Sequence, residues 1–181
     1  GAPLAGGRWQ LISDITGVAY GQGSWCKDPE GALYFIGSRG GLYRITLGGG
    51  IEWVTRNSID RRLSDLDLDR FYVELRWNWR ADGINIYVIP YGSAGTIVKH
   101  WFWGRKHDEW REDQFTSALV QPQASAIIDG ALATDRRLVT ASEEGYVLAW
   151  DEDSLTDDGQ VISWQELIGP LHVPRRRVRA T

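Results

Sequence analysis

The chain of 181 residues contains no methionine and a single cysteine, Cys26. One cysteine cannot form a disulfide within the chain, so a buried core has to hold the fold, and a chain of this length can bury one. No run of about 18 apolar residues occurs, which excludes a membrane-spanning helix. Because translation starts at methionine, its absence leads us to expect a processed product or a piece of a longer protein.

Residues for catalysis are also scarce. The chain has three histidines, His100, His107 and His172, and neither their spacing nor that of the cysteine matches a zinc site. A Gly-x-Ser-x-Gly nucleophile motif and a phosphate-binding glycine loop are both missing. We interpret Cys26, which follows Trp25, as a small buried hydrophobic residue. The sequence therefore predicts no enzymatic activity, no cofactor and no metal.

Charge of neither sign dominates, since 20 Lys+Arg face 24 Asp+Glu and the formal net charge is −4. A mildly acidic chain is poorly suited to wrapping DNA with its whole surface. One basic cluster occurs, formed by Arg175, Arg176, Arg177 and Arg179. It is the one candidate contact for nucleic acid or an acidic partner. The alternatives are an edge strand or an arm that reaches a neighbouring protein, and we favour the arm.

Tryptophan and glycine are abundant, with 10 and 21 residues, and they mark a repeat. Three segments share one pattern of a β-rich run, a glycine turn and a second β-rich run. The paired runs are residues 32–38 and 41–46, 84–90 and 96–103, and 137–142 and 146–150. A tryptophan follows each pair, at Trp53, Trp110 and Trp164, and another apolar run precedes each pair, at 17–20, 71–77 and 125–128. Each unit thus offers four short strands in about 50 residues.

Four antiparallel strands at this period are typical of a β-propeller blade. We predict an all-β propeller, or a propeller segment, of about three four-stranded blades in a single domain. The blade-like units are residues 17–56, 71–113 and 125–169, with partial strands at 8–12 and 171–179. A β-sandwich with many short strands is the alternative. Three units are fewer than the four blades that a ring usually needs, so the ends pair into a partial blade, or the chain is an open arc.

The segment 59–71 carries the acidic residues that we select as candidate partner contacts, namely Asp60, Asp65, Asp67 and Asp69. Its Asp–Leu alternation is compatible with a helical turn, a strand or a loop. On an extended strand, alternate carboxylates would share a face and form an oxygen cage for Ca²⁺. The pattern lacks the glycine and terminal glutamate of an EF-hand, and arginines are adjacent. We favour a solvated connector between two units, and we interpret the acidic segment 151–159 as a surface loop.

The aromatic run at residues 101–103 is followed by Arg105 and Lys106, a combination found in platforms that stack bases or sugars. In a strand, Trp101 and Trp103 share one face, and packing between blades is the favoured interpretation. The same reasoning applies to the tryptophans at 77 and 79. Alternation also places His100 on one face with the residues at 98 and 102.

Four stretches resemble β-propeller proteins of tailed bacteriophage particles: Ile59-Asp60-Arg61-Arg62, the run 83–90, the run 100–105, and the closing residues 157–162 and 168–170. The resemblance spans about residues 17–170 and rests on strand-and-turn patterns that include no catalytic signature. It implies a tail, neck or nozzle component that assembles into rings and is located in the virion, after assembly in the host cytoplasm. No functional residue carries over from it.

The leading hypothesis is therefore a non-enzymatic structural module that contacts copies of itself or other virion proteins. A carbohydrate- or protein-binding propeller of cellular origin is the alternative. Exposure of Trp101, Trp103 or Trp110 would favour it. A propeller hydrolase would need carboxylates that converge on a central channel.

Overall fold

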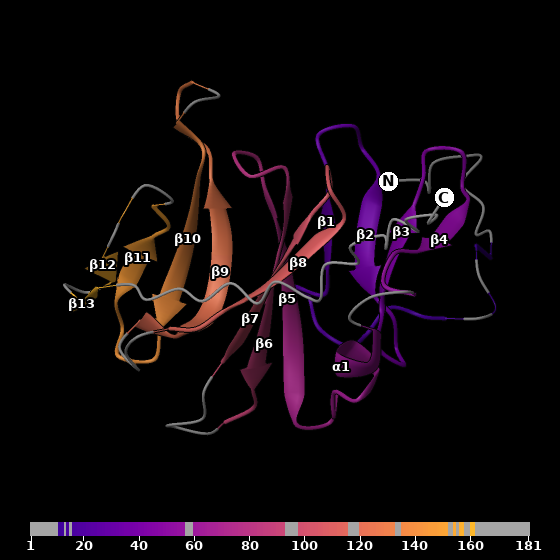
Figure 1. Cartoon of the computed structure of the whole chain (residues 1–181), viewed down its shortest axis with the longest axis horizontal. Coiled ribbons are helices and arrows are strands. Elements are labelled where there is room, and N and C mark those ends of the chain that lie inside the picture. The colour runs from indigo at the N-terminus through magenta and orange to yellow at the C-terminus, as the bar shows by residue number, and fades with distance from the viewer. Residues whose placement is uncertain are drawn as a thin grey trace, which may run out of the picture.

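In the part of the chain that it describes, the computed structural model shows an all-β fold with three antiparallel sheets of three or four strands, a two-stranded ribbon and one short helix (Figure 1). It describes residues 11–12, 14, 16–56, 60–92, 98–115, 120–132, 135–151, 154, 156–157 and 160–161. The sheets follow the order of the chain, so every strand pairs with a sequence neighbour. This meander agrees with the alternating runs and glycine turns of the sequence, which favour local hairpins.

Sheet 1 contains β1 (Trp25–Lys27), β2 (Leu33–Ile36), β3 (Leu42–Ile45) and β4 (Ile51–Trp53) in that order. The expected glycine turn lies between β2 and β3, where Gly40 and Gly41 have φ angles of 82° and 83°. These angles suit residues without a Cβ atom. The expected first strand at 17–20 is wrong. That segment contributes an isolated bridge between Val18 and Gly37, and β1 takes the edge position.

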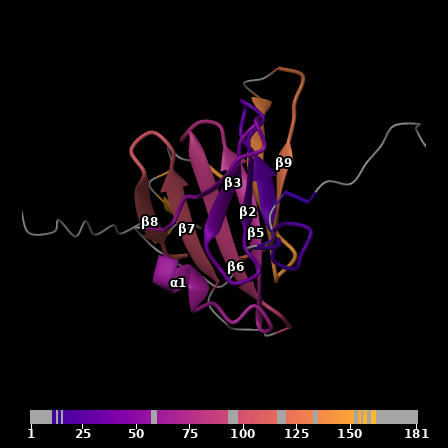
Figure 2. The same ribbon diagram turned by 90° about the vertical axis from the view of Figure 1, so that its right-hand side faces the viewer.

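Helix α1 (Asp60–Ser64) and the turns after it connect sheet 1 to sheet 2 at one end of the sheets (Figure 2). Leu63 is fully buried in the core, and Leu66 and Leu68 pack against that core. Asp65, Asp67 and Asp69 are exposed. The connector interpretation is thereby confirmed for these three residues. The extended strand that a Ca²⁺ cage would need does not form, because the leucines fold the segment into a helix and turns.

Sheet 2 is the longest and contains β5 (Phe71–Asn78), β6 (Gly83–Pro90), β7 (Lys99–Gly104) and β8 (Glu109–Asp113). Every residue of β6 is buried. A strand that is buried on both faces belongs to a sheet that is covered on both sides. Sheet 2 therefore lies in the middle of the row of sheets, with sheet 1 on one face and sheet 3 on the other (Figure 1).

Sheet 3 contains β9 (Pro122–Ile128), β10 (Arg137–Ser142) and β11 (Val147–Ala149). A two-stranded ribbon, β12 (Thr156–Asp157) with β13 (Gln160–Val161), follows. Among the described residues, the sheet of the third unit thus has three of the expected four strands. The expected strand around Trp164 and the partial strand at 171–179 lie outside the described residues. Of the partial strand at 8–12, the structure describes residues 11 and 12, which are not in a strand.

The first strands of the three sheets contact one another in turn, β1 with β5 and β5 with β9. Among the described residues the sheets form an open row and do not close on themselves. The prediction of an all-β repeat of antiparallel sheets is confirmed at this level. Closure into a propeller stays a prediction.

The main core lies between sheets 1 and 2. Its largest side chains are Tyr34, Trp77, Trp101 and Trp103, and the Tyr34 ring lies 5.7 Å from Trp77 and 5.5 Å from Trp103 between centroids. Trp101 and Trp103 share the buried face, as their spacing predicted. Trp79 is different: it is 38 % exposed beneath the Arg136 guanidinium, so its assignment to the core is wrong. It lies just beyond the end of β5, where alternation no longer applies.

Candidate functional site: polar clusters and open sheet faces

Polar side chains join sheets 2 and 3. Glu74 Oε2 accepts hydrogen bonds from the Ser125 backbone N–H at 2.7 Å and the Ser125 hydroxyl at 2.5 Å. Arg76 donates to the Ser125 carbonyl oxygen at 3.0 and 2.7 Å, and the Tyr72 hydroxyl donates to the Gln123 carbonyl oxygen at 2.5 Å. We call these five residues the polar seam. Because hydrogen bonds require fixed geometry, the seam determines how β9 lies against β5.

The polar seam provides a first test of how the sheets are held. We expect Glu74→Ala to lower the free energy of unfolding by about 2 kcal/mol, because the Ser125 N–H and hydroxyl lose their acceptor and Arg76 loses a carboxylate 3.4 Å away in a mostly buried place. Urea denaturation measures the loss, and hydrogen exchange of β9 and β10 should rise more than that of β2. Glu52→Ala is the matched control, since Glu52 is exposed and its contact with Arg44 spans 3.9 Å. Equal losses in the two variants would contradict the role of the seam.

His100 lies fully buried on the face of sheet 2 that carries the polar seam. Its Nε2 is 3.0 Å from Asn85 Oδ1, and its Nδ1 is 3.3 Å from Asp113 Oδ2, without hydrogen-bond geometry at the second contact. The ring stacks on Tyr87 and Phe115, with centroids 4.6 and 5.8 Å away. His100 shares its face with the residues at 98 and 102, as alternation predicted.

Burial lowers the pKa of His100 to about 3, and the positive charge of Arg111 adds to the shift. The nearby Asp113 carboxylate would favour a charged histidine, but burial also raises the pKa of Asp113, so its negative charge is itself disfavoured. The histidine is therefore neutral at physiological pH. Without access to solvent, it serves as a packing and hydrogen-bonding group within the sheet.

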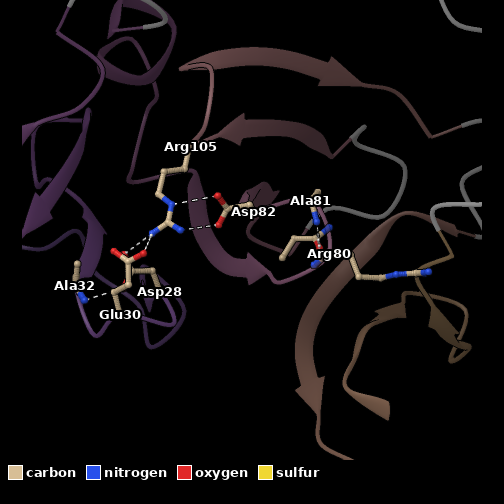
Figure 3. A network of polar contacts seen from close by, with 8 residues as sticks. Asp28, Glu30, Ala32, Arg80, Ala81, Asp82 and Arg105 are labelled. Atoms are coloured by element: carbon tan, nitrogen blue, oxygen red, sulfur yellow. Dashed lines mark hydrogen bonds and ion pairs between the residues drawn. The ribbon is translucent and has the colours of Figure 1, made fainter. Parts of the chain in front are cut away.

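A second charged cluster ties sheet 1 to sheet 2 at the hairpin end of the strands (Figure 3). Arg105 contacts Asp28 Oδ2 at 3.4 Å, Glu30 Oε1 at 3.1 Å and Asp82 Oδ1 at 2.9 Å. The Asp28 side chain is completely buried and also accepts a hydrogen bond from the Ala32 N–H at 2.8 Å. Arg105 also lies over the Trp77 ring. A stacking platform that includes Arg105 was the less favoured interpretation of the sequence, and the guanidinium is engaged in holding two sheets together.

Cys26 is buried in the same core. Burial raises the pKa of its thiol to about 12, and Asp28 adds to the rise while Arg76 opposes it. A nucleophilic cysteine requires a lowered pKa and access to its partner. The interpretation of Cys26 as a buried hydrophobic residue is confirmed.

The candidate partner contacts from the sequence do not come together into one described site. Asp65, Asp67 and Asp69 are exposed along the connector, and Asp69 N–H donates to Asp67 Oδ1 at 3.1 Å. Asp60 begins α1, and its side chain is not among those described. The basic cluster, Arg175, Arg176, Arg177 and Arg179, lies outside the described residues. In the part of the chain that the structure describes, no group of three or more His, Cys, Asp or Glu residues could hold a metal ion.

One feature that sequence reasoning missed is a row of aromatic side chains across all four strands of sheet 1. The strand register places Trp25 beside Phe35, Phe35 beside Tyr43, and Tyr43 beside Trp53. The rings of the last three stack at 5.5 and 5.6 Å between centroids. Tyr34 points into the core, so this row lies on the opposite face of the sheet. Trp25 and Trp53 at the two ends are 45 % and 41 % exposed, whereas Phe35 between them is buried, with 2 % exposed.

An open apolar face occurs on sheet 3. Ser125 points toward sheet 2, so its neighbours Ala124 and Ala126 lie on the far face. Register places Ala124, Ala126, Val139, Ala141, Val147 and Ala149 together there. These side chains are apolar and short, and Val147 is 70 % exposed. Sheet 3 therefore presents an apolar face at one end of the row of sheets, whereas the exposed members of the aromatic row on sheet 1, at the other end, are Trp25 and Trp53. Period-two alternation in the sequence could have found each face, but it does not tell which face a neighbour covers.

In the described part of the chain, no helix has the length and apolar character needed to cross a bilayer. Comparison of the chain with protein-family models, with curated protein sequences and with solved structures gave no match.

Proposed function

We propose that this chain is a non-enzymatic structural module that works through protein–protein contacts in a phage-like particle. The observation that carries the proposal is the exposed apolar surface at the two ends of the row of sheets, formed by the open face of sheet 3 and by Trp25 and Trp53 on sheet 1. Exposed apolar surface of this kind usually marks an interface. Hydrogen bonds and ion pairs join each sheet to the next, so the row of sheets can hold its exposed apolar surface in a fixed orientation, which suits assembly.

The groups with the best chemistry for catalysis support the same proposal. His100 is fully buried and neutral, and the Cys26 thiol is buried with a raised pKa. Arg105 is engaged with Asp28, Glu30 and Asp82. Each of these groups is buried or engaged by other side chains in the folded chain.

We further propose that the sheets are blades of a β-propeller. The successive contacts β1–β5 and β5–β9 support this, because the first strands of propeller blades are neighbours around the central axis. Electron-microscopy class averages of the purified protein test the idea. A ring with a central channel is expected, and a filled two-layer particle would favour the sandwich instead.

Within this proposal, the location is the virion, after assembly in the host cytoplasm, as the resemblance to tailed-phage propeller proteins implies. The exposed carboxylates Asp65, Asp67 and Asp69 offer contacts to other virion proteins, with Asp60 and the basic cluster as further candidates. Any contact with nucleic acid would use the basic cluster.

Fractionation of the source material tests the particle role. We expect the chain to sediment with intact particles and to occur in them at a constant copy number, measured by quantitative mass spectrometry. A chain recovered only as a free monomer, never in a particle or an oligomer, would contradict the proposal.

A carbohydrate- or protein-binding module is the second candidate. The tryptophans that would have favoured it, Trp101 and Trp103, are buried, and Trp110 packs against the core. One observation still supports it, namely the exposed edges of Trp25 and Trp53 in the aromatic row. A glycan array separates the candidates, since oligosaccharide binding that Trp53→Ala abolishes would favour the binding module.

A further inference from the structure

The outer edge of sheet 3 differs from the outer edges of the other two sheets. In each sheet this edge belongs to the last strand in chain order, which is β4, β8 or β11. β4 carries Glu52 at its centre, and four of the five residues of β8 are charged. Charged side chains on an edge strand keep other strands from pairing with it. β11 consists of valine, leucine and alanine, so its edge has no such protection.

The backbone of β11 offers hydrogen-bonding groups along this edge. Tyr146 and Trp150, on either side of the strand, bond through their backbone to β10 at 2.9 and 2.8 Å. In an antiparallel pair, residues that bond to the neighbouring strand alternate with residues that do not. The N–H and C=O groups of Val147 and Ala149 therefore point away from β10. Among the described strands none pairs with β11 on that side, and the Val147 side chain is 70 % exposed.

The charge beside this edge is negative. Glu143 and Glu144 lie in the turn between β10 and β11, and both are exposed. A partner strand with a positive charge where it passes this turn is therefore attracted. Every strand pair in the three sheets is antiparallel. Because β11 runs away from the turn, an antiparallel partner would bring its C-terminal end to the two glutamates.

We propose that the outer edge of β11 binds an extended segment of another protein chain, which adds a fourth strand to sheet 3. The segment has uncharged residues along β11 and a basic residue at its C-terminal end, beside Glu143 and Glu144. Main-chain hydrogen bonds to Val147 and Ala149 provide the binding, and the charges select the orientation. Sheet 3 then has four strands, as sheets 1 and 2 have. This inference rests on the proposed function, because it specifies one contact through which the module assembles.

Two short synthetic peptides with blocked ends test the contact. Both alternate threonine and valine, and one ends in arginine whereas the other ends in glutamate. Fluorescence anisotropy of the labelled peptides measures their binding to the full chain. We expect the arginine peptide to bind at least about tenfold more tightly at low salt, and the difference should shrink as ionic strength rises. The double variant Glu143→Lys, Glu144→Lys should reverse the preference.

Proline variants distinguish edge pairing from other kinds of contact. Val147→Pro removes an N–H that points away from β10, so sheet 3 keeps its own hydrogen bonds while peptide binding falls at least about tenfold. Val147→Ala keeps the N–H and should bind like the wild type. Ile51→Pro is the matched control, because it makes the same kind of change on the outer edge of β4. Circular dichroism checks folding, and Ala149→Pro replaces Val147→Pro if the latter does not fold.

Hydrogen exchange of the Ala149 N–H, followed by nuclear magnetic resonance, reports on the edge directly. It should be fast in the free chain and slow when the arginine peptide is bound. Equal binding of the two peptides, binding that survives Val147→Pro, or no binding to the wild type would overturn the inference. Slow exchange without any peptide would also overturn it, because the edge would then be filled already, as by the strand expected around Trp164, outside the described residues.

The results also separate this inference from the proposed function. A chain that sediments with particles but binds neither peptide overturns the edge contact and leaves the structural role intact. A chain that binds the arginine peptide through β11 but never occurs in particles leaves the edge contact intact and overturns the particle role.

Discussion

Replacement of Trp101 by alanine is expected to lower the free energy of unfolding by about 3–5 kcal/mol. Trp101 is 2 % exposed in the core between sheets 1 and 2. Truncation removes apolar contacts and leaves a cavity that the surrounding strands can only partly fill, because the neighbouring side chains belong to paired strands. Urea denaturation followed by far-ultraviolet circular dichroism measures the effect without relying on tryptophan fluorescence.

Trp79→Ala is the matched control for this experiment. Trp79 is 38 % exposed and contacts Arg136 through its ring face, so its loss should cost about 1 kcal/mol or less. Trp101→Phe should fall between the two, and it keeps the comparison possible if the alanine variant does not fold. If Trp101→Ala retained full stability and instead lost binding to a sugar or a base, the original alternative of a stacking platform would be correct and the core assignment would be wrong.

Acidification from about pH 7 to about pH 4 is expected to lower the free energy of unfolding by about 3 kcal/mol through His100 alone. The ring has a pKa of about 3 in the folded chain, against the ordinary value of 6.5. Between these values the unfolded chain binds a proton that the folded chain does not. Stability is therefore complete above about pH 6.5 and is lost progressively as the pH falls toward 3.

Asp113 lies close to His100 and also titrates, so a variant is needed to isolate the contribution of His100 to the pH dependence of stability. Asp113 acts in the opposite sense, because its raised pKa lets the folded chain keep a proton that the unfolded chain releases. His100→Gln removes the histidine titration while leaving Asp113 and Arg111 in place. Chemical denaturation at several pH values should give the wild type a steeper loss of stability in acid than His100→Gln, whatever the stabilities at neutral pH.

His107→Gln is the control, because His107 is exposed in the turn between β7 and β8. It should keep the pH dependence of the wild type. If His100→Gln lost stability in acid as steeply as the wild type does, the buried neutral state of His100 would be refuted.

The strands and their order could be predicted from the sequence, because hairpins depend on short-range properties. Period-two alternation and glycine turns located β2 and β3, the start of β5, and the pair β10 and β11. They failed at residues 17–20, where an apolar run looked like a strand but contributes one isolated bridge. For the segment 59–71 they left a helical turn, a strand and a loop open, and the burial of Leu63 in the core accompanies a helix at 60–64. In both places contacts with distant residues outweigh a weak local preference.

The sequence by itself determined that this chain is built from consecutive antiparallel sheets with its aromatic side chains as packing material. It also indicated that Cys26 is buried. Only the tertiary structure decided which face of each sheet is covered. Alternation places Trp101 and Phe102 on opposite faces of their strand, and likewise Tyr34 and Phe35. Because both members of each pair are large aromatic residues, alternation does not tell which of the two faces the core. The stacking of sheet 1 on sheet 2 and of sheet 2 on sheet 3 makes one row a core and leaves the row from Trp25 to Trp53 on the face turned away from sheet 2. The reason is physical: alternation is a property of one strand, whereas burial depends on which other sheet lies against it.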